Sequence, residues 1–250
     1  MPFKPANPKS VPPKQFTSWS NSRWNDYQQC PAKAKFKHLD KLPEPKSPQM
    51  ERGIYIALQE EDYFLDKVKQ VPPDIHKNLV PEFKRIKKPA KGKELMVEQN
   101  WGFDRNWNVV DYFDWKNCWL RIKVDVGYLL KGVELHLYDN KTGGADKSTG
   151  KLRESDREKY EEQLDLYRAG GIARFPQVQT LATKLIYTDL GVTYPFDGPL
   201  MSTAAQAIKS QQDWSKRVRP MFNDTKFNPR PGYYCRWCHY RKSNGGPCKY

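Results

Sequence analysis

Two aspartates and a lysine near the middle of the chain combine acidic and basic side chains at close spacing. Asp125 is followed fourteen residues later by Asp139, and Lys141 comes two residues after that. Carboxylates held a few ångströms apart repel each other unless a hard cation such as Mg²⁺ or Mn²⁺ lies between them. A neighbouring ammonium can orient or deprotonate an attacking water and stabilise the charge that develops on a phosphate. The simpler interpretation is a surface hairpin with ordinary charges.

Two predicted β-strands would bring these three side chains together. Apolar and polar residues alternate over 120–126 and again over 133–137, and Lys131-Gly132 provides the turn between them. An extended chain sends residues two apart to the same face, so Asp139 and Lys141 project together. Pairing of the strands then brings Asp125 towards the same end.

A helix is predicted directly after the hairpin, over 151–169. Strong helix formers fill this segment, and we expect Gly170-Gly171 to end it. Gln163 and Tyr167 lie one turn apart on one stripe of this helix. The stripe is either a buried packing face with Gln163 at its edge, or a face whose amide and phenol look onto the two aspartates.

The order of these motifs resembles the active site of the PD-(D/E)xK nucleases, and in particular their RecB-like branch. In that branch Asp-x-Lys-Thr-Gly, here Asp139 to Gly143, ends the catalytic hairpin, and Gln-x-x-x-Tyr, here Gln163 to Tyr167, follows it. The resemblance implies a metal-dependent nuclease in which Lys141 activates the attacking water, while Gln163 and Tyr167 position the phosphate.

The same resemblance implies the metal ligands. Asp125 and Asp139 would hold one or two Mg²⁺ or Mn²⁺ ions, joined by the backbone carbonyl of Asn140. Glu98 matches the acidic residue that some RecB-like members supply before the hairpin aspartate, so it is a candidate third carboxylate ligand.

One position departs from the family pattern. The helix predicted over 50–64 carries Gly-x-x-x-His in RecB-like members, with the histidine as a further metal ligand, but here Gly53 is followed by Ala57. Glu60 and Glu61, one turn on, could substitute, since carboxylates bind hard cations as well as imidazole does. The simpler expectation is that both glutamates belong to a solvated charged face.

The five cysteines indicate a metal site rather than disulfides, because their number is odd and no export signal is visible. Cys235 and Cys238 have Cys-x-x-Cys spacing, Cys248 lies nearby, and Cys30 completes a four-thiolate set if the fold brings the two ends of the chain together. The spacing fits a 4Fe-4S cluster or tetrahedral zinc, with His239 replacing Cys30 as an alternative zinc ligand.

The cysteine arrangement resembles the iron-sulfur staple of AddB-like and CRISPR-adaptation nucleases. In those proteins the cysteine equivalent to Cys30 is the first ligand. The resemblance therefore favours the 4Fe-4S cluster over zinc.

The net charge of +14 argues for a polyanionic partner, nucleic acid before membrane. No apolar run approaches the ~20 residues of a membrane span, and residues 1–13 lack the apolar segment of a signal peptide, so a cytoplasmic location is expected. A basic loop over 85–93 suits either a phosphate backbone or a solvated surface. Residues 205–250 hold ten Lys or Arg against two Asp, and DNA contact is expected there. Six aromatic residues of this segment are candidates for stacking or packing: Trp214, Phe222, Phe227, Tyr233, Tyr234 and Trp237.

The sequence predicts an α/β fold similar to the restriction-endonuclease-like core, with a mixed central sheet flanked by helices and both termini joined in a cysteine-ligated metal lobe. Residues 1–17 are expected to form a flexible arm, 18–204 the nuclease core, and 205–250 a basic segment whose cysteine cluster Cys30 completes.

Two functions are consistent with this pattern. The first is a metal-dependent DNA exonuclease, preferring single strands or duplex ends, that serves recombination, repair or DNA processing. The alternative is a non-catalytic DNA-binding module with a cysteine-ligated zinc ion or iron-sulfur cluster, motivated by Ala57. Retention of the chemically demanding residues favours the nuclease. The choice between DNA and RNA stays open, because no motif reads a 2′-hydroxyl.

Overall fold

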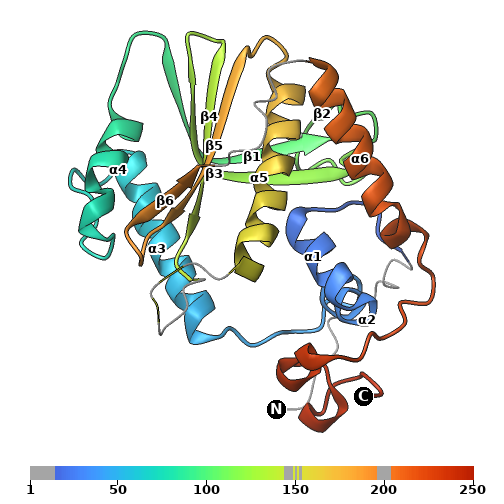
Figure 1. Ribbon diagram of the computed structural model, residues 1–250. Helices are drawn as coiled ribbons and strands as arrows, with labels where there is room; N and C mark the ends of the chain where they lie inside the picture. The colour runs from blue at the N-terminus through green and yellow to red at the C-terminus, as the bar shows by residue number, and fades with distance from the viewer. Residues whose placement is uncertain (1–14, 144–148, 150, 152–153, 196–203) are drawn as a thin grey trace. The chain divides into compact units, whose positions relative to one another are not determined.

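The computed structural model of the chain describes residues 15–143, 149, 151, 154–195 and 204–250 (Figure 1). They divide into two compact units. The sheet unit contains residues 47–213, and the terminal unit combines residues up to Lys46 with Trp214–Tyr250. Most of the expected flexible arm, residues 1–14, lies outside the described residues.

The sheet unit is built on a six-stranded mixed sheet with the order β2-β1-β3-β4-β5-β6. Only β4 and β5 pair in parallel, and the other neighbours are antiparallel. This arrangement confirms the predicted α/β class with a mixed sheet. The strands are β1 Lys93–Phe103, β2 Val109–Val110, β3 Leu120–Leu130, β4 Glu134–Lys141, β5 Thr180–Tyr187 and β6 Val192–Pro195.

The predicted hairpin is formed by β3 and β4. Its antiparallel register runs from Leu130 opposite Glu134 to Val126 opposite Tyr138. Lys131 and Gly132 both adopt positive φ, at 52° and 72°, which is the backbone of a tight hairpin turn. One residue beyond the last pair, the two strands carry the two aspartates of the motif.

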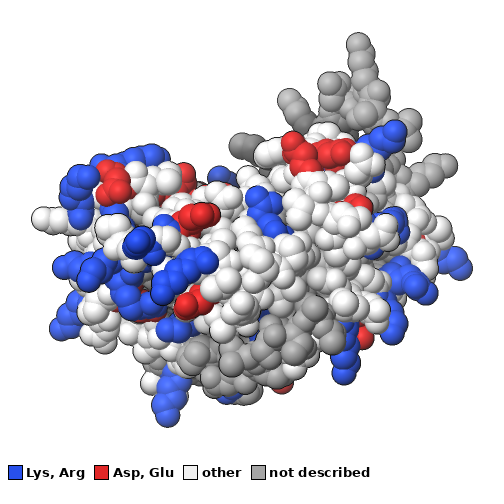
Figure 2. Space-filling model, turned by 90° about the horizontal axis from the view of Figure 1, so that it is seen from above, with Lys and Arg blue, Asp and Glu red and all other residues white. Residues whose placement is uncertain are grey.

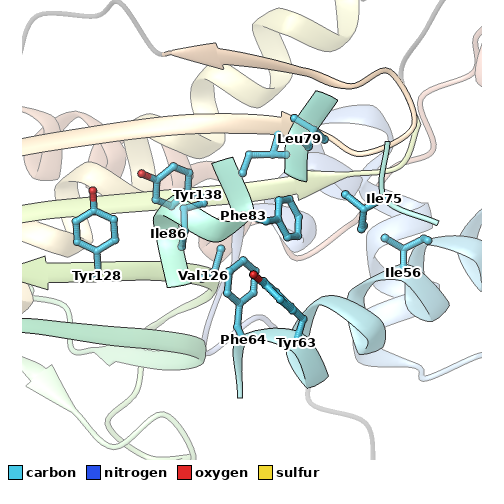
Figure 3. Packing of buried hydrophobic residues seen from close by; sticks show 11 residues of the cluster. Ile56, Tyr63, Phe64, Ile75, Leu79, Phe83, Ile86, Val126, Tyr128 and Tyr138 are labelled. Atoms are coloured by element: carbon cyan, nitrogen blue, oxygen red, sulfur yellow. The ribbon is translucent and has the colours of Figure 1, made fainter. Parts of the chain in front are cut away.

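Two helices, α3 (Pro48–Phe64) and α4 (Val80–Lys87, preceded by the short 3₁₀ turn Lys77–Leu79), pack an apolar cluster against one face of the sheet. Phe64 of α3 stacks on Phe83 of α4 with ring centroids 5.2 Å apart, and both lie against strand residues (Figure 3). Ser47 caps α3 by accepting a hydrogen bond from the backbone N–H of Met50 at 3.2 Å. The cluster contains Ile56, Tyr63, Phe64, Ile75, Leu79, Phe83, Ile86, Val126, Tyr128, Tyr138 and Ile186.

The opposite face is covered by α5 (Glu154–Arg174), which is longer than the predicted 151–169. Gly170 and Gly171 do not end this helix. A Cβ on Gly170 would lie 2.5 Å from Cδ1 of Ile122, and one on Gly171 would lie 2.8 Å from Cδ2 of Leu135. The prediction of a helix stop was wrong because the glycines allow close approach to the sheet.

Lys and Arg side chains gather over the α4 end of the sheet unit (Figure 2), where the basic loop over 85–93 was predicted. Several of these cations have structural partners. Arg85 pairs with Glu82 and donates to the hydroxyl of Tyr138 at 2.7 Å, while Lys93 donates to backbone carbonyls, including that of Lys88 at 2.9 Å. These side chains brace α4 against the sheet.

The terminal unit brings the two ends of the described chain together. Trp19 stacks on Trp214 at 5.5 Å between ring centroids, and Phe16 packs edge-on against Phe227 at 5.9 Å. Its N-terminal elements are α1 Asn21–Gln29, α2 Pro31–Ala34 and the π-helical turn Lys35–Leu39. Its C-terminal elements are the second half of α6 (Ala204–Asn223) and the 3₁₀ turns Tyr233–Trp237 and Lys242–Asn244.

None of the helices in the described part of the chain has the length and apolar character that a membrane crossing requires.

Gly170→Ala is expected to lower the free energy of unfolding by about 1–2 kcal/mol, because overpacking of a core costs more than the gain in helix propensity returns. Gly53→Ala in α3 is the matched control, since its Cβ would meet only Oγ1 of Thr142 at 3.4 Å. The control should be neutral or more stable by up to about 1 kcal/mol. Denaturant unfolding of both variants measures the difference, and a Gly170→Ala chain as stable as the native one would contradict the tight packing of α5.

Candidate active site

A cleft of about 410 Å³ opens where the β3–β4 hairpin ends between α3 and α5. It is lined by residues of α3, β1, β3, β4 and α5. The structure thereby brings together all of the residues predicted as catalytic or as metal ligands at this site. These are Glu98, Asp125, Asp139, Asn140, Lys141, Gln163 and Tyr167.

Asp139 is the most enclosed of these groups, with 1% of its surface exposed. Its Oδ1 accepts a hydrogen bond from Nε2 of Gln163 at 2.7 Å, and its Oδ2 forms an ion pair with Nζ of Lys141. Each oxygen is therefore held from a different direction, and the carboxylate has one fixed orientation.

Tyr167 completes this support from the next turn of α5. Its hydroxyl lies 2.6 Å from the backbone carbonyl of Lys123 and 3.2 Å from Oδ1 of Asp139. A phenol carries one proton, which the shorter contact places on the carbonyl of Lys123. The same oxygen can accept from Nε2 of Gln163 at 3.2 Å. Gln163 and Tyr167 thus fasten α5 to β3 as well as to Asp139.

Asp125 lies across the hairpin from Asp139. Its Oδ2 accepts a hydrogen bond from the backbone N–H of Asn140 at 2.9 Å. Burial and the negative charge of Asp139 raise the pKa of Asp125 to about 7, although Lys141 and the Asn140 N–H act in the opposite direction. The site therefore gathers more negative charge than it neutralises with its own side chains.

Lys141 is the half-buried cation of the site. Burial alone would lower the pKa of its ammonium, but Asp139 and Asp125 outweigh burial and raise that pKa above the ordinary value. Its Nζ also lies 5.0 Å from the centroid of the Tyr160 ring. In this arrangement Lys141 is protonated at neutral pH.

The expectation of a solvated face is wrong for Glu60, which is 4% exposed and lines the cleft. Its Oε2 accepts from Nδ2 of Asn140 at 2.8 Å, while its buried Oε1 has no hydrogen-bond partner. Burial, and then the charges of Asp125, Glu98 and Asp139, raise the pKa of Glu60 to about 8 against the Asn140 hydrogen bond. Glu61 does not line the cleft. The burial of Glu60 depends on which side of α3 faces the sheet. Glu60 follows Gly53 by seven residues, or two helical turns, so the two lie on the same side of α3, and this spacing could have indicated that Glu60 faces the site.

Glu98 reaches the cleft through an unusual backbone. Its φ is 49°, in the left-handed region, and its neighbours Val97 and Gln99 both pair with β3 while Glu98 itself does not. Such a conformation costs a non-glycine residue about 1–3 kcal/mol and is concentrated at functional sites. The carboxylate forms an ion pair with Lys123.

The donor set suits a hard cation. Mg²⁺ keeps several waters and is commonly held by only one or two protein carboxylates, which Asp125 and Asp139 supply. The unpartnered Oε1 of Glu60 adds a buried oxygen without a hydrogen-bond donor. Within the described ranges, no three His, Cys, Asp or Glu side chains are already spaced as ligands of one ion.

Four of the five cysteines surround a second cavity, of about 170 Å³, in the terminal unit: Cys30, Cys235, Cys238 and Cys248. All are free thiols. Sγ of Cys30 accepts a backbone N–H bond from Arg230 at 3.4 Å, and burial, then the neighbouring Cys30 and Cys248 thiols, raise the pKa of Cys238. His239 does not line this cavity. The fifth, Cys118, is buried in the sheet unit, as expected.

The mixed sheet defines an α/β protein that carries two aspartates and a lysine at the end of its central hairpin. The chain belongs to the PD-(D/E)XK nuclease superfamily, whose family model matches residues 18–243. The sequence prediction is thus confirmed at the level of the superfamily.

Solved structures that are similar to the chain include the following two. One is a candidate exonuclease from Eubacterium rectale, with 16% identity, a TM-score of 0.47 and coverage of 91% of this chain and 89% of that one. The other is SSO0001, with 14% identity, a TM-score of 0.39 and coverage of 97% and 90%. No curated protein matches the chain.

Glu60→Gln is expected to stabilise the metal-free chain at neutral pH by about 1–3 kcal/mol. The folded state keeps a proton on Glu60 up to about pH 8, whereas the unfolded chain releases it near pH 4.5. Native stability therefore falls as pH rises between these values, and the glutamine variant avoids this loss.

Urea unfolding in EDTA at pH 4 and pH 7 measures the effect. The gain should be present at pH 7 and absent at pH 4, where both states are protonated. Glu61→Gln, the next residue along α3 but outside the cleft, is the control. An equal gain at both pH values would contradict the burial of a protonated Glu60.

Proposed function

We propose that the chain is a metal-dependent DNA exonuclease that prefers single strands or duplex ends and acts in recombination, repair or DNA processing. The observation that carries the proposal is the fixed orientation of buried Asp139 between Lys141 and Gln163, with Asp125 in the same cleft. Membership of the nuclease superfamily supports it, and the net charge of +14 suits a nucleic-acid substrate.

Asp125, Asp139 and the backbone carbonyl of Asn140 would hold Mg²⁺ or Mn²⁺, with Glu60 and Glu98 as further oxygen donors. When bound, the ion supplies Lewis-acid stabilisation of the charge that develops on the phosphate. Glu60 takes the role that the RecB-like pattern gives to histidine, because it faces the cleft from the turn of α3 that follows Ala57.

The remaining residues act through position and charge. The ammonium of Lys141 orients the attacking water and stabilises the negative charge of the transition state. Gln163 holds Asp139, and Tyr167 in turn supports Gln163. Both side chains border the space where the phosphate would lie, so they help to position it. Because every one of these side chains is fixed by a second contact, little reorganisation is needed when substrate binds.

The second candidate function is a DNA-binding module that does not cleave. Ala57, which lines the cleft where the family pattern has histidine, is the observation that favours it. The buried Glu60 argues against it, because the cleft retains a ligand-type side chain on the same helix.

We also propose that Cys30, Cys235, Cys238 and Cys248 bind a 4Fe-4S cluster, with zinc as the alternative. Their placement around one cavity, although Cys30 is some 200 residues from the others, supports a shared ligand. Backbone N–H groups directed at Sγ of Cys30 and Cys235 would stabilise thiolates there.

Asp125→Ala and Lys141→Ala are each expected to reduce DNA cleavage by at least about 10²-fold, because each removes a charge needed in the transition state. Loss of end label from single-stranded and duplex DNA with Mg²⁺, Mn²⁺ or EDTA measures it. Lys184→Ala removes a lysine that pairs with Glu82 away from the cleft, so it should cleave normally. Metal-dependent cleavage that survives in both site variants would overturn the site. Binding by the native chain without cleavage under any metal would favour the binding module.

Cys30→Ser is expected to remove the bound metal from the terminal unit, because three thiols cannot complete the site. Protein purified without oxygen should be brown and contain iron. A colourless preparation that contains zinc would favour zinc as the bound metal. His239→Ala is the matched control and should keep its metal. The reverse outcome, in which the metal survives Cys30→Ser and is lost with His239→Ala, would exclude the four-cysteine site.

A further inference from the structure

The aromatic residues of the C-terminal segment fall into two groups. Trp214, Phe222 and Phe227 are buried and form part of the packing of the terminal unit. Tyr233, Tyr234 and Trp237 are 64%, 62% and 65% exposed, although all three belong to one short 3₁₀ turn. Burying such rings would release free energy, so three of them exposed on a single turn indicate a surface that binds a ligand.

The charged residues of the segment that carries these rings are of one sign. Residues 225–250 contain six Lys or Arg and no Asp or Glu. The guanidinium of Arg236 lies 5.0 Å from the centroid of the Tyr233 ring, and Nζ of Lys249 lies 5.2 Å from that of Tyr250, which is also exposed. Arg230 and Lys242 are exposed as well. The surface therefore combines open π-faces with cations that suit phosphate groups.

The rings are also held in place. Tyr233 and Trp237 meet edge-to-face with centroids 4.7 Å apart. The turn that carries them is closed by backbone bonds from Cys235 to Gly232 at 3.0 Å and from Cys238 to Cys235 at 3.3 Å. A pre-ordered aromatic surface loses little conformational entropy on binding.

We propose that Tyr233, Tyr234 and Trp237 form a stacking platform for the bases of single-stranded DNA, whose phosphates contact Arg230, Arg236 and Lys242. The assignment of DNA rests on the proposed nuclease function. Bases offer their faces to aromatic side chains only when they are unstacked, so the platform selects a single strand over an intact duplex. An acidic protein would satisfy the cations but has few planar groups to cover three rings. The inference deepens the proposed function by assigning its substrate class.

The test compares binding of fluorescent oligothymidylate with that of an abasic oligomer of equal length. Both are measured without added Mg²⁺ or Mn²⁺, so that cleavage plays no part. Trp237→Ala and Tyr234→Ala are each expected to weaken oligothymidylate binding about tenfold, the effect of losing one stacked base, and to leave abasic binding within twofold. Trp237→Phe should restore most of the affinity. Trp115→Ala is the matched control, because this tryptophan is 80% exposed but lies in the sheet unit.

The other binding outcomes overturn the assignment of the platform to single-stranded DNA. Unchanged oligothymidylate binding in both alanine variants would show that the rings do not stack on bases. Equal losses for oligothymidylate and abasic DNA would show an electrostatic or folding effect, and metal content with thermal unfolding identifies the latter. Preferential loss of oligouridylate binding would assign the platform to RNA. Cleavage by the native chain with unchanged binding in the variants would refute the platform alone. Tenfold losses in a chain that cuts no DNA would refute the nuclease alone.

Discussion

The burial of several carboxylates in one cleft is the constraint on which the rest of the sheet unit depends. Removing ionised carboxylates from water is costly, and bringing them together adds repulsion. The raised pKa values of Asp125 and Glu60, about 7 and about 8, express this cost in the metal-free chain. Lys141 offsets part of it, and a divalent cation would offset the rest. In the proposed function this charge has a use, because it would bind a cation beside the phosphate of the substrate.

Helices that pack on the two faces of the hairpin hold these groups in place. On one side α3 presents Glu60, and on the other α5 presents Gln163 and Tyr167. Glycines allow α5 to approach closely, because a Cβ on Gly170 or Gly171 would overlap buried side chains of the sheet. Two packed layers thus fix side chains that would otherwise repel one another. Apolar packing of the helices against the sheet offsets the free-energy cost of gathering charged side chains in the cleft.

Much of this site follows from sequence because its spacing is local. The period of a strand places Asp139 beside Lys141, and one helical turn joins Gln163 to Tyr167. The short turn at Lys131-Gly132 sets the hairpin register that brings in Asp125. Glu60 could not be assigned in the same way, since the buried side of a helix is decided by its partners. The continuation of α5 through Gly170 was likewise hidden, because intrinsic propensity favours a stop there and only tertiary packing reverses that preference. Sequence also could not show which of the C-terminal aromatic residues are buried, because tertiary packing decides that as well.

The terminal unit presents a different balance of forces. It joins two segments of the chain separated by more than 160 residues, so its assembly must overcome the entropy of closing a long loop. The stacked pair Trp19 and Trp214 contributes to this, but the C-terminal part consists of short 3₁₀ turns with few buried residues. Small units of this kind usually need a covalent or metal link. Thiols from both segments around one cavity would supply it, and the same link would fix the turn that carries the exposed rings. Metal binding and recognition of a strand would then depend on one structural element.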